Sequence, residues 1–143
     1  MKKLFTFVVF LFIVAISSSA LATNWAEVCT AKGYIVYVDK DSIRHGIYSK
    51  QFRESRNDGF SAHVKVVEEK SGKKHFIYLM GFWIDKDFFA KETARYYAHL
   101  DELDENGNPL PSQYTPMLQV CRVDDDTDGV APILYNYIEK NLP

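Results

Sequence analysis

The sequence has little net charge and no recognisable catalytic motif, and each shortage excludes a class of function. Its 17 Lys and Arg stand against 19 Asp and Glu, which gives a formal net charge of −2. Nucleic acid requires a concentrated basic face, and anionic lipid headgroups attract basic segments, so neither is expected as a partner. The sequence contains no H-E-x-x-H motif, no G-x-S-x-G motif and no His–Cys pair at a recognisable spacing. We therefore predict a non-enzymatic protein with no catalytic residue, no metal site and no cofactor.

Cysteine is also scarce, with two in the whole chain, Cys29 and Cys121. Neither has a His or a second Cys at ligand spacing, which disfavours a metal site or a reactive thiol. In an oxidising compartment an even pair more often forms a disulfide. We therefore expect a Cys29–Cys121 bridge, which would close a loop of about 90 residues and stabilise the fold by roughly 4–5 kcal/mol.

The one long apolar run lies at the N-terminus. Lys2 and Lys3 precede the apolar stretch 4–16, and Ala20-Leu21-Ala22 follows it. A basic start, a short apolar stretch and a small-x-small site are typical of a secretory signal peptide, and the run is shorter than the about 20 residues that span a bilayer. We expect residues 1–22 to be removed and residues 23–143 to be exported as one domain, to the periplasm, the outer surface or the medium. No later run predicts an integral membrane segment.

After residue 22 the dominant pattern is alternation of apolar and polar residues, which predicts an antiparallel sheet. The expected strands are Trp25–Thr30, Tyr34–Val38, Gly46–Glu54, Phe60–Glu69, His75–Asp85 and Met117–Val123, with hairpin turns at Asn57-Asp58-Gly59 and Ser71-Gly72. His75–Asp85 is apolar on both faces, so we expect it to be the central strand.

The segment 88–103 fits two patterns. Phe89, Tyr96 and Leu100 belong to a helical stripe, whereas Tyr96, Ala98 and Leu100 also fit one face of a strand. The pair Asn106-Gly107 is a preferred hairpin turn, which favours a strand entering it. The prolines at 109, 111 and 116 predict an edge or irregular segment beyond the turn.

The C-terminal segment predicts an amphipathic helix. Its apolar stripe consists of Val130, Ile133, Leu134, Tyr137 and Ile138. Such a stripe needs an apolar partner, and we expect it to pack on one face of the sheet around the central strand.

Two acidic segments could carry chemistry, and a structural role is favoured for both. The first half of a calcium-loop pattern is matched by Asp124, Asp126 and Asp128. The pattern also requires a bidentate Glu, and Tyr135 stands at that position. An acidic cluster at the start of a helix is therefore favoured over a metal site. The Asp39-Lys40-Asp41-Ser42 segment offers paired carboxylates for acid–base chemistry, yet such side chains commonly stabilise turns. The four histidines are His45, His63, His75 and His99, and their scatter favours surface or hydrogen-bonded roles.

Several short motifs together resemble the bacterial surface-adhesin protein E-like family. They are Trp25-Ala26-Glu27-Val28, Tyr37-Val38-Asp39-x-Asp41-Ser42-Ile43, Arg95-Tyr96-Tyr97 leading into Asp104-Glu105-Asn106-Gly107-Asn108, and Pro132-x-x-Tyr135-x-x-Ile138. The resemblance implies an antiparallel sheet packed against a C-terminal helix, a strand at 88–103, and binding to host extracellular-matrix proteins. The chain departs from the family in lacking a lipid-attachment Cys after the signal and in where its cysteines lie, and no binding residue carries over.

We therefore predict an α+β fold, a strongly twisted antiparallel sheet of about six to seven strands with a C-terminal helix packed on one face. The predicted function is an exported, adhesin-like interaction module with a protein partner, and a homodimer stays open. The alternative is a small periplasmic ligand-binding or inhibitor-type protein that uses a sheet face or the crevice between sheet and helix.

Overall fold

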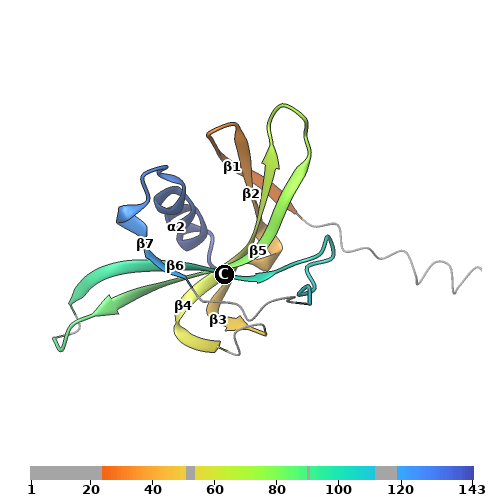
Figure 1. Ribbon diagram of the computed structural model, residues 1–143. Helices are drawn as coiled ribbons and strands as arrows, with labels where there is room; N and C mark the ends of the chain where they lie inside the picture. Colours follow the sequence, from red (N-terminus) through yellow and green to blue (C-terminus); the bar gives the residue numbers. More distant parts are fainter. Residues whose placement is uncertain (1–23, 51–53, 90, 112–118) are drawn as a thin grey trace, which may run out of the picture.

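The computed structural model describes residues 24–50, 54–89, 91–111 and 119–143, and the predicted signal peptide lies outside them. Within these ranges the chain forms one antiparallel sheet and one C-terminal α-helix, which confirms the predicted fold class (Figure 1). The strands are β1 (Trp25–Ala31), β2 (Tyr34–Asp39), β3 (Arg44–Ser49), β4 (Glu54–Glu68), β5 (Lys74–Lys86), β6 (Glu92–Glu102) and β7 (Val120–Arg122). The helix is α2 (Val130–Lys140), and two short 3-10 turns are η1 (Lys40–Ser42) and η2 (Val123–Asp125). No helix in the described ranges is long and apolar enough to cross a membrane.

The strand order is β1-β2-β4-β5-β6-β7, with β3 paired to β4 off this path. β4 and β5 lie in the middle, and β5 carries apolar side chains on both faces, as its sequence predicts. Met80 and Phe82 belong to the core on the helix side. Ile77, Leu79 and Trp83 belong to a second core on the far face. The sheet is thus covered on both sides, because each face of the central strands must be removed from water.

Helix α2 packs against β1, β4 and η2, and Figure 1 shows it lying against one side of the sheet. Its buried residues are Ala131, Leu134, Tyr135 and Ile138. The ring of Tyr135 meets Phe60 and Phe82 edge-on, at centroid distances of 5.1 Å and 5.9 Å. The predicted stripe is therefore rotated: Ile133 is 46% exposed, and Tyr135 takes its place in the core. The prediction missed Tyr135 because it followed the spacing from Val130 through Ile133 to Tyr137, whereas the buried side of the helix runs through Ala131, Leu134, Tyr135 and Ile138. The ring of Tyr135 packs there like a hydrocarbon while its hydroxyl reaches a polar partner.

The predicted hairpin at Asn57-Asp58-Gly59 is wrong, because these residues lie inside the long strand β4. The chain reverses earlier, between Ser49 and Glu54, which pair with each other. A Cβ at Gly59 would lie 2.4 Å from the carbonyl oxygen of Phe82 and 2.9 Å from Cδ1 of Ile47. Gly59 therefore serves a close approach between strands rather than a tight turn.

Both cysteines are free, so the predicted Cys29–Cys121 disulfide is wrong for this structure. Cys29 lies in β1 and Cys121 in β7, the two end strands of the sheet, with four strands between them in the order. Neighbouring strands are about 4.8 Å apart, and a disulfide needs Cα atoms within about 7 Å. Cys29 packs against the helix-side core, and its burial raises the pKa of the thiol.

The segment 88–103 is resolved in favour of a strand, since β6 runs from Glu92 to Glu102. The predicted turn at Asn106-Gly107 is also confirmed: the N–H of Gly107 donates to the carbonyl of Asp104 at 3.1 Å. Beyond the turn, Pro109 forms one isolated bridge to Leu103. Residues 112–118, which include Pro116, lie outside the described ranges.

Candidate functional site

The β5–β6 hairpin extends beyond the rest of the sheet as a two-stranded arm. β4 pairs with β5 as far as Trp83, and the next pairs, from Ile84 with Arg95 to Lys86 with Glu92, join β5 to β6 alone in the described part of the chain. Figure 1 shows this arm reaching away from the other strands at the lower left. An isolated two-stranded hairpin is marginally stable, so the arm needs fixed points at its root and at its tip.

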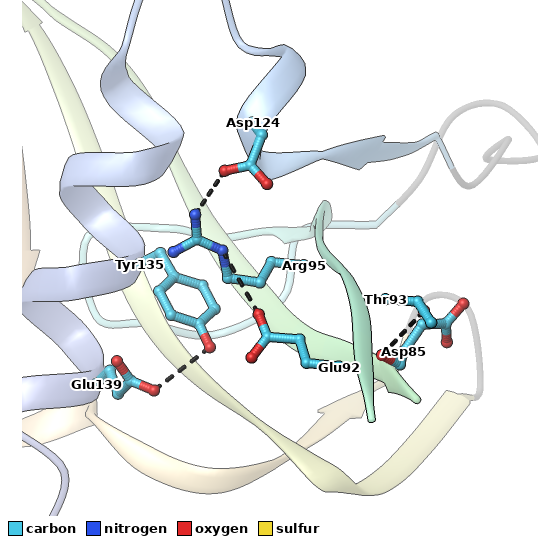
Figure 2. Close-up of polar contacts among 7 residues, drawn as sticks. All are labelled: Asp85, Glu92, Thr93, Arg95, Asp124, Tyr135 and Glu139. Carbon is cyan, nitrogen blue, oxygen red and sulfur yellow. Dashed lines mark hydrogen bonds and ion pairs between the residues drawn. The ribbon is translucent and has the colours of Figure 1, made fainter. Parts of the chain in front are cut away.

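Arg95 fixes the root of the arm to the helix, as Figure 2 shows. Its guanidinium pairs with Asp124 of η2 and lies 3.9 Å from the carboxylate of Glu92. The same group stands 5.0 Å above the ring of Tyr135, whose hydroxyl donates to Glu139 at 3.3 Å. Burial, with Glu139 adding to it, raises the pKa of Tyr135 to about 12, so the hydroxyl keeps its proton and the hydrogen bond persists at neutral pH.

Asp87 fixes the tip. Its Oδ1 accepts the backbone N–H groups of Phe89 and Lys91, each at 2.9 Å, and its own N–H donates to the carbonyl of Lys91 at 2.9 Å. A short acidic side chain that bonds the backbone ahead of it is a common way to order a turn. These bonds tie Asp87, at the start of the turn, to both Phe89 and Lys91.

Two aromatic side chains stand on this ordered tip. Phe88 is 97% exposed and Phe89 is 85% exposed, and their rings meet edge-on at 5.6 Å. Burying a phenylalanine side chain contributes roughly 1.5–3 kcal/mol, so the isolated protein leaves roughly 3–6 kcal/mol of contact unused at this point. We call Phe88 and Phe89 the aromatic tip. A large apolar surface on an ordered protrusion is typical of a docking element.

A cleft of about 390 Å³ lies on the far face of the sheet, between η1, β4 and the turn that follows β6. It is lined by Trp25, Asp39, Asp41, Ser42, Ile43, Arg44, His63, Ile77, Asp104, Asn106 and Gly107, and we call it the far-face cleft. The predicted turn at 39–42 forms one wall. The Oδ1 of Asp39 accepts the N–H of Asp41 at 3.2 Å, and Ser42 donates to the carbonyl of Asp39 at 2.7 Å, which confirms the turn interpretation.

His63 and the turn at 104–108 form the opposite side of this cleft. A Cβ on Gly107, whose φ is +78°, would lie 3.2 Å from Cε1 of His63, so the turn packs directly on the imidazole. The turn is held by the carboxylate of Asp104, which accepts the N–H groups of Asn108 at 2.9 Å and of Asn106 at 2.8 Å. These bonds hold the pKa of Asp104 below its usual value. Burial lowers the pKa of His63, while Asp39 opposes and Arg44 reinforces that shift.

The predicted crevice between sheet and helix holds a smaller hollow, of about 230 Å³. Its floor is apolar, with Val64 and Met80 from the sheet and Leu134 from α2. His99 stands at its rim, 5.0 Å from the ring of Tyr78. The imidazole reaches solvent through the hollow yet is surrounded by protein, and this desolvation lowers its pKa against the influence of Asp126.

The acidic run before α2 is divided among separate structural tasks. Asp124 pairs with Arg95, and Asp128 pairs with Lys32 of the β1–β2 turn. Asp126 accepts the N–H of Ala131 at 2.7 Å, which satisfies a free donor at the start of the helix. Within the described ranges no group of three or more His, Cys, Asp or Glu side chains gathers in a way that could hold a metal ion. Asp126 thus has the predicted role at the start of the helix, whereas Asp124 and Asp128 pair with basic residues elsewhere in the fold.

Sequence reasoning missed the aromatic tip. The sequence pattern places Phe89 on a helical stripe and gives no role to Phe88. The available signal was local: Asp87 stands directly before two adjacent aromatic residues, at the point where one alternating segment ends and another begins. Of the two remaining histidines, His45 lies in β3 with its Nε2 3.3 Å from the carbonyl oxygen of Pro143. His75 lies in β5, outside the residues whose side chains the structure describes.

Comparison with protein-family models, with curated proteins and with solved structures finds no match to this chain. The resemblance to the surface-adhesin protein E-like family stays a prediction.

Proposed function

We propose that the protein is an exported, non-catalytic interaction module that docks on a protein partner through the aromatic tip. The observation that carries this proposal is the exposure of Phe88 and Phe89 on a turn that Asp87 holds in place. Aromatic residues dominate the binding energy of many interfaces, where they fill pockets on the partner. A loop that is already ordered loses little conformational entropy on binding, so more of its contact energy appears as affinity.

The charges around the tip favour a protein over a lipid surface. Lys86 and Lys91 are matched by Asp85, Asp87 and Glu92, so the arm carries no excess of positive charge. Anionic headgroups attract basic segments and repel carboxylates. Insertion of the tip into a bilayer would also bring Asp87 into the apolar boundary, at a high desolvation cost. A pocket on a protein can receive the two rings and leave these carboxylates at its wet rim.

An extracellular-matrix protein is the specific form of partner that the family resemblance suggests. Export, the cell surface and this partner class are parts of the proposal, as is the absence of catalysis. A second copy of the chain is the competing partner, because a tip on each copy could dock on the other.

The test replaces both tip residues with serine, F88S/F89S, and measures binding to immobilised collagen and fibronectin by surface plasmon resonance. A hot-spot residue contributes about 2 kcal/mol or more, so we expect F88S/F89S to weaken binding about 30-fold or more. The free energy of unfolding should change by no more than about 0.5 kcal/mol, since both rings are exposed. Tyr48→Ser is the matched control, because Tyr48 is an aromatic residue 56% exposed on β3, away from the arm.

Three outcomes would contradict the proposal. The first is equal binding by F88S/F89S and the unchanged protein, and the second is an equal loss of binding in Tyr48→Ser. The third is binding of the unchanged protein to phosphatidylcholine–phosphatidylglycerol vesicles that F88S/F89S loses, which would assign the tip to a bilayer. Sedimentation equilibrium of both proteins identifies a homodimer if the tip mediates it.

A further inference from the structure

We infer that the far-face cleft binds a small zwitterion that carries one ammonium and one carboxylate group, such as an amino acid or a dipeptide. The volume of about 390 Å³ lies within the usual range for small-molecule sites. None of the residues lining the cleft belongs to the arm, so this site is separate from the aromatic tip.

Asp39 provides the negative side of the site. Its residue is only 5% exposed, and its Oδ1 accepts the N–H of Asp41. No hydrogen bond to a described residue is formed by Oδ2. Every fully buried side-chain oxygen in the described part of the chain has a partner, so Oδ2 is in contact with solvent, and Asp39 lines the cleft. A carboxylate that is so far removed from bulk water favours a charged donor, and a ligand ammonium group is the simplest one.

Arg44 provides the positive side. Its Nε donates to Oγ of Ser61 at 3.3 Å, which holds the side chain along the wall of the cleft. Its two terminal nitrogens form no hydrogen bond to a described residue and remain available. A guanidinium group matches a carboxylate in shape and can donate two parallel hydrogen bonds to it. The neighbouring His63, whose ring nitrogens also have no described partner, adds a neutral hydrogen-bonding group beside it.

The signs of these charges exclude simpler ligands. A simple anion would be repelled by Asp39 and Asp41, and a simple cation would leave Arg44 unused. A sugar would need the open face of an aromatic ring for stacking. The indole of Trp25 already carries the ammonium group of Lys65, 4.4 Å from its centroid, so that face is occupied. A molecule with both charges satisfies both walls of the cleft, and the apolar Ile77 at its floor can receive a small side chain.

The experiment titrates the protein with L-alanine and with L-alanyl-L-alanine and follows amide shifts by NMR. The ammonium and carboxylate groups lie about 3.5 Å farther apart in alanyl-alanine than in alanine. The probe that binds better therefore reports the distance between the negative and the positive wall of the cleft. N-acetyl-alanyl-alanine removes the ammonium charge, and alanyl-alanine amide removes the carboxylate charge. We expect the better of the two zwitterions to bind, with shifts around residues 39–44 and 104–107, and each blocked analogue to bind at least tenfold more weakly.

Two variants assign each charge to its residue. In Asp39→Asn, acetylation of the ligand should cost nothing further, whereas amidation should still weaken binding. In Arg44→Gln, amidation of the ligand should cost nothing further, whereas acetylation should still weaken binding. The matched controls are Asp125→Asn and Arg122→Gln, an exposed acidic–basic pair outside the cleft whose charged groups lie 4.0 Å apart. Neither control should change binding.

Four results would overturn the inference. They are no shift with either zwitterion at millimolar concentration, shifts that lie outside the cleft, equal binding of the blocked and free dipeptides, and binding of glucose in their place. If Asp39→Asn fails to fold, Arg44→Gln and the ligand series still decide the question. None of these measurements depends on the aromatic tip, so this inference and the proposed function fail separately.

Discussion

Asp101 is a buried charge whose position depends on one irregularity of the sheet. Met80 pairs with His99 and Tyr78 pairs with Glu102, so β6 has an extra residue opposite Leu79. This β-bulge turns Asp101, which is 2% exposed, toward the end of β3. The carboxylate there accepts the hydroxyl of Ser49 at 2.7 Å and the N–H of Lys50 at 2.9 Å.

Asp101→Ala should lower the free energy of unfolding by about 1–3 kcal/mol or more, because the fully buried hydroxyl of Ser49 loses its acceptor. Urea denaturation followed by circular dichroism measures the change. Asp125→Ala removes an exposed aspartate and should leave stability within about 0.5 kcal/mol. Equal stability of the two variants would show that the bulge does not anchor β3.

His63 makes the stability of the fold depend on pH. Burial lowers the pKa of its imidazole in the folded protein below the ordinary value of about 6.5, so the unfolded chain binds a proton more readily. The free energy of unfolding should therefore fall as the pH drops below about 6.5, and it should stop falling from this cause below the folded pKa. NMR titration of the ring protons should give a midpoint under 6.5, and His63→Gln should reduce the loss of stability between pH 7 and pH 5. A midpoint at or above 6.5 would contradict the prediction.

At the scale of elements, α2 contains a matched pair of apolar neighbours with opposite surroundings. Leu134 is 1% exposed, and Ile133 is 46% exposed. Leu134→Ala should cost about 2–5 kcal/mol of unfolding free energy, because it leaves a cavity between the helix and the sheet. Ile133→Ala should cost much less, since its side chain already meets water, and alanine favours the helix. Thermal or urea melts of both variants check the orientation of the helix, and equal losses would place its buried side elsewhere.

Local residue patterns predicted those elements that are determined by interactions between residues close in sequence. Alternation predicted the strands, and Asn106-Gly107 predicted a turn that the carboxylate of Asp104 indeed holds. The equally strong signal at Asn57-Asp58-Gly59 failed, because Gly59 is required by the approach of Phe82 and Ile47, which are distant in sequence. No local pattern reports such an approach. The same reason explains the rotated helix stripe, since the positions of Phe60 and Phe82 determine where Tyr135 packs.

The candidate sites likewise divide into features that local sequence predicts and features that depend on contacts between residues distant in sequence. The turn at 39–42 and the contact of Asp126 with the start of α2 were predictable, because each rests on hydrogen bonds to nearby backbone. The ion pairs of Asp124 with Arg95 and of Asp128 with Lys32 were not, since they join residues distant in sequence. The far-face cleft was not, since it joins the turn at 39–42 to His63 and to the turn at 104–108 across three strands of the sheet. The free cysteines belong here too, because strand order, which sequence spacing does not reveal, separates them.

At the scale of the whole molecule, the two faces of the sheet and the arm beyond its edge have different roles. The helix side is closed by α2, while the far face holds the cleft, and the arm leaves the sheet where β4 ceases to pair with β5. The middle strand β5 is common to all three, because it contributes Met80 to the helix-side core, Ile77 to the cleft and Ile84 to the arm. A partner on the arm and a small ligand in the cleft would therefore share a scaffold without sharing a residue.

The packing of α2 against β1 and β4 also bears on the order in which the fold can form. The far-face core is assembled from residues between Ile47 and Leu103, most of them in successive hairpins. The helix-side core needs Leu134 and Ile138 to meet Val36 and Val38, about a hundred residues earlier. Closing so long a loop costs entropy before any contact repays it, so the helix-side contacts should form late. A chain that folds from its N-terminus thus keeps one face of its sheet uncovered until α2 packs on it.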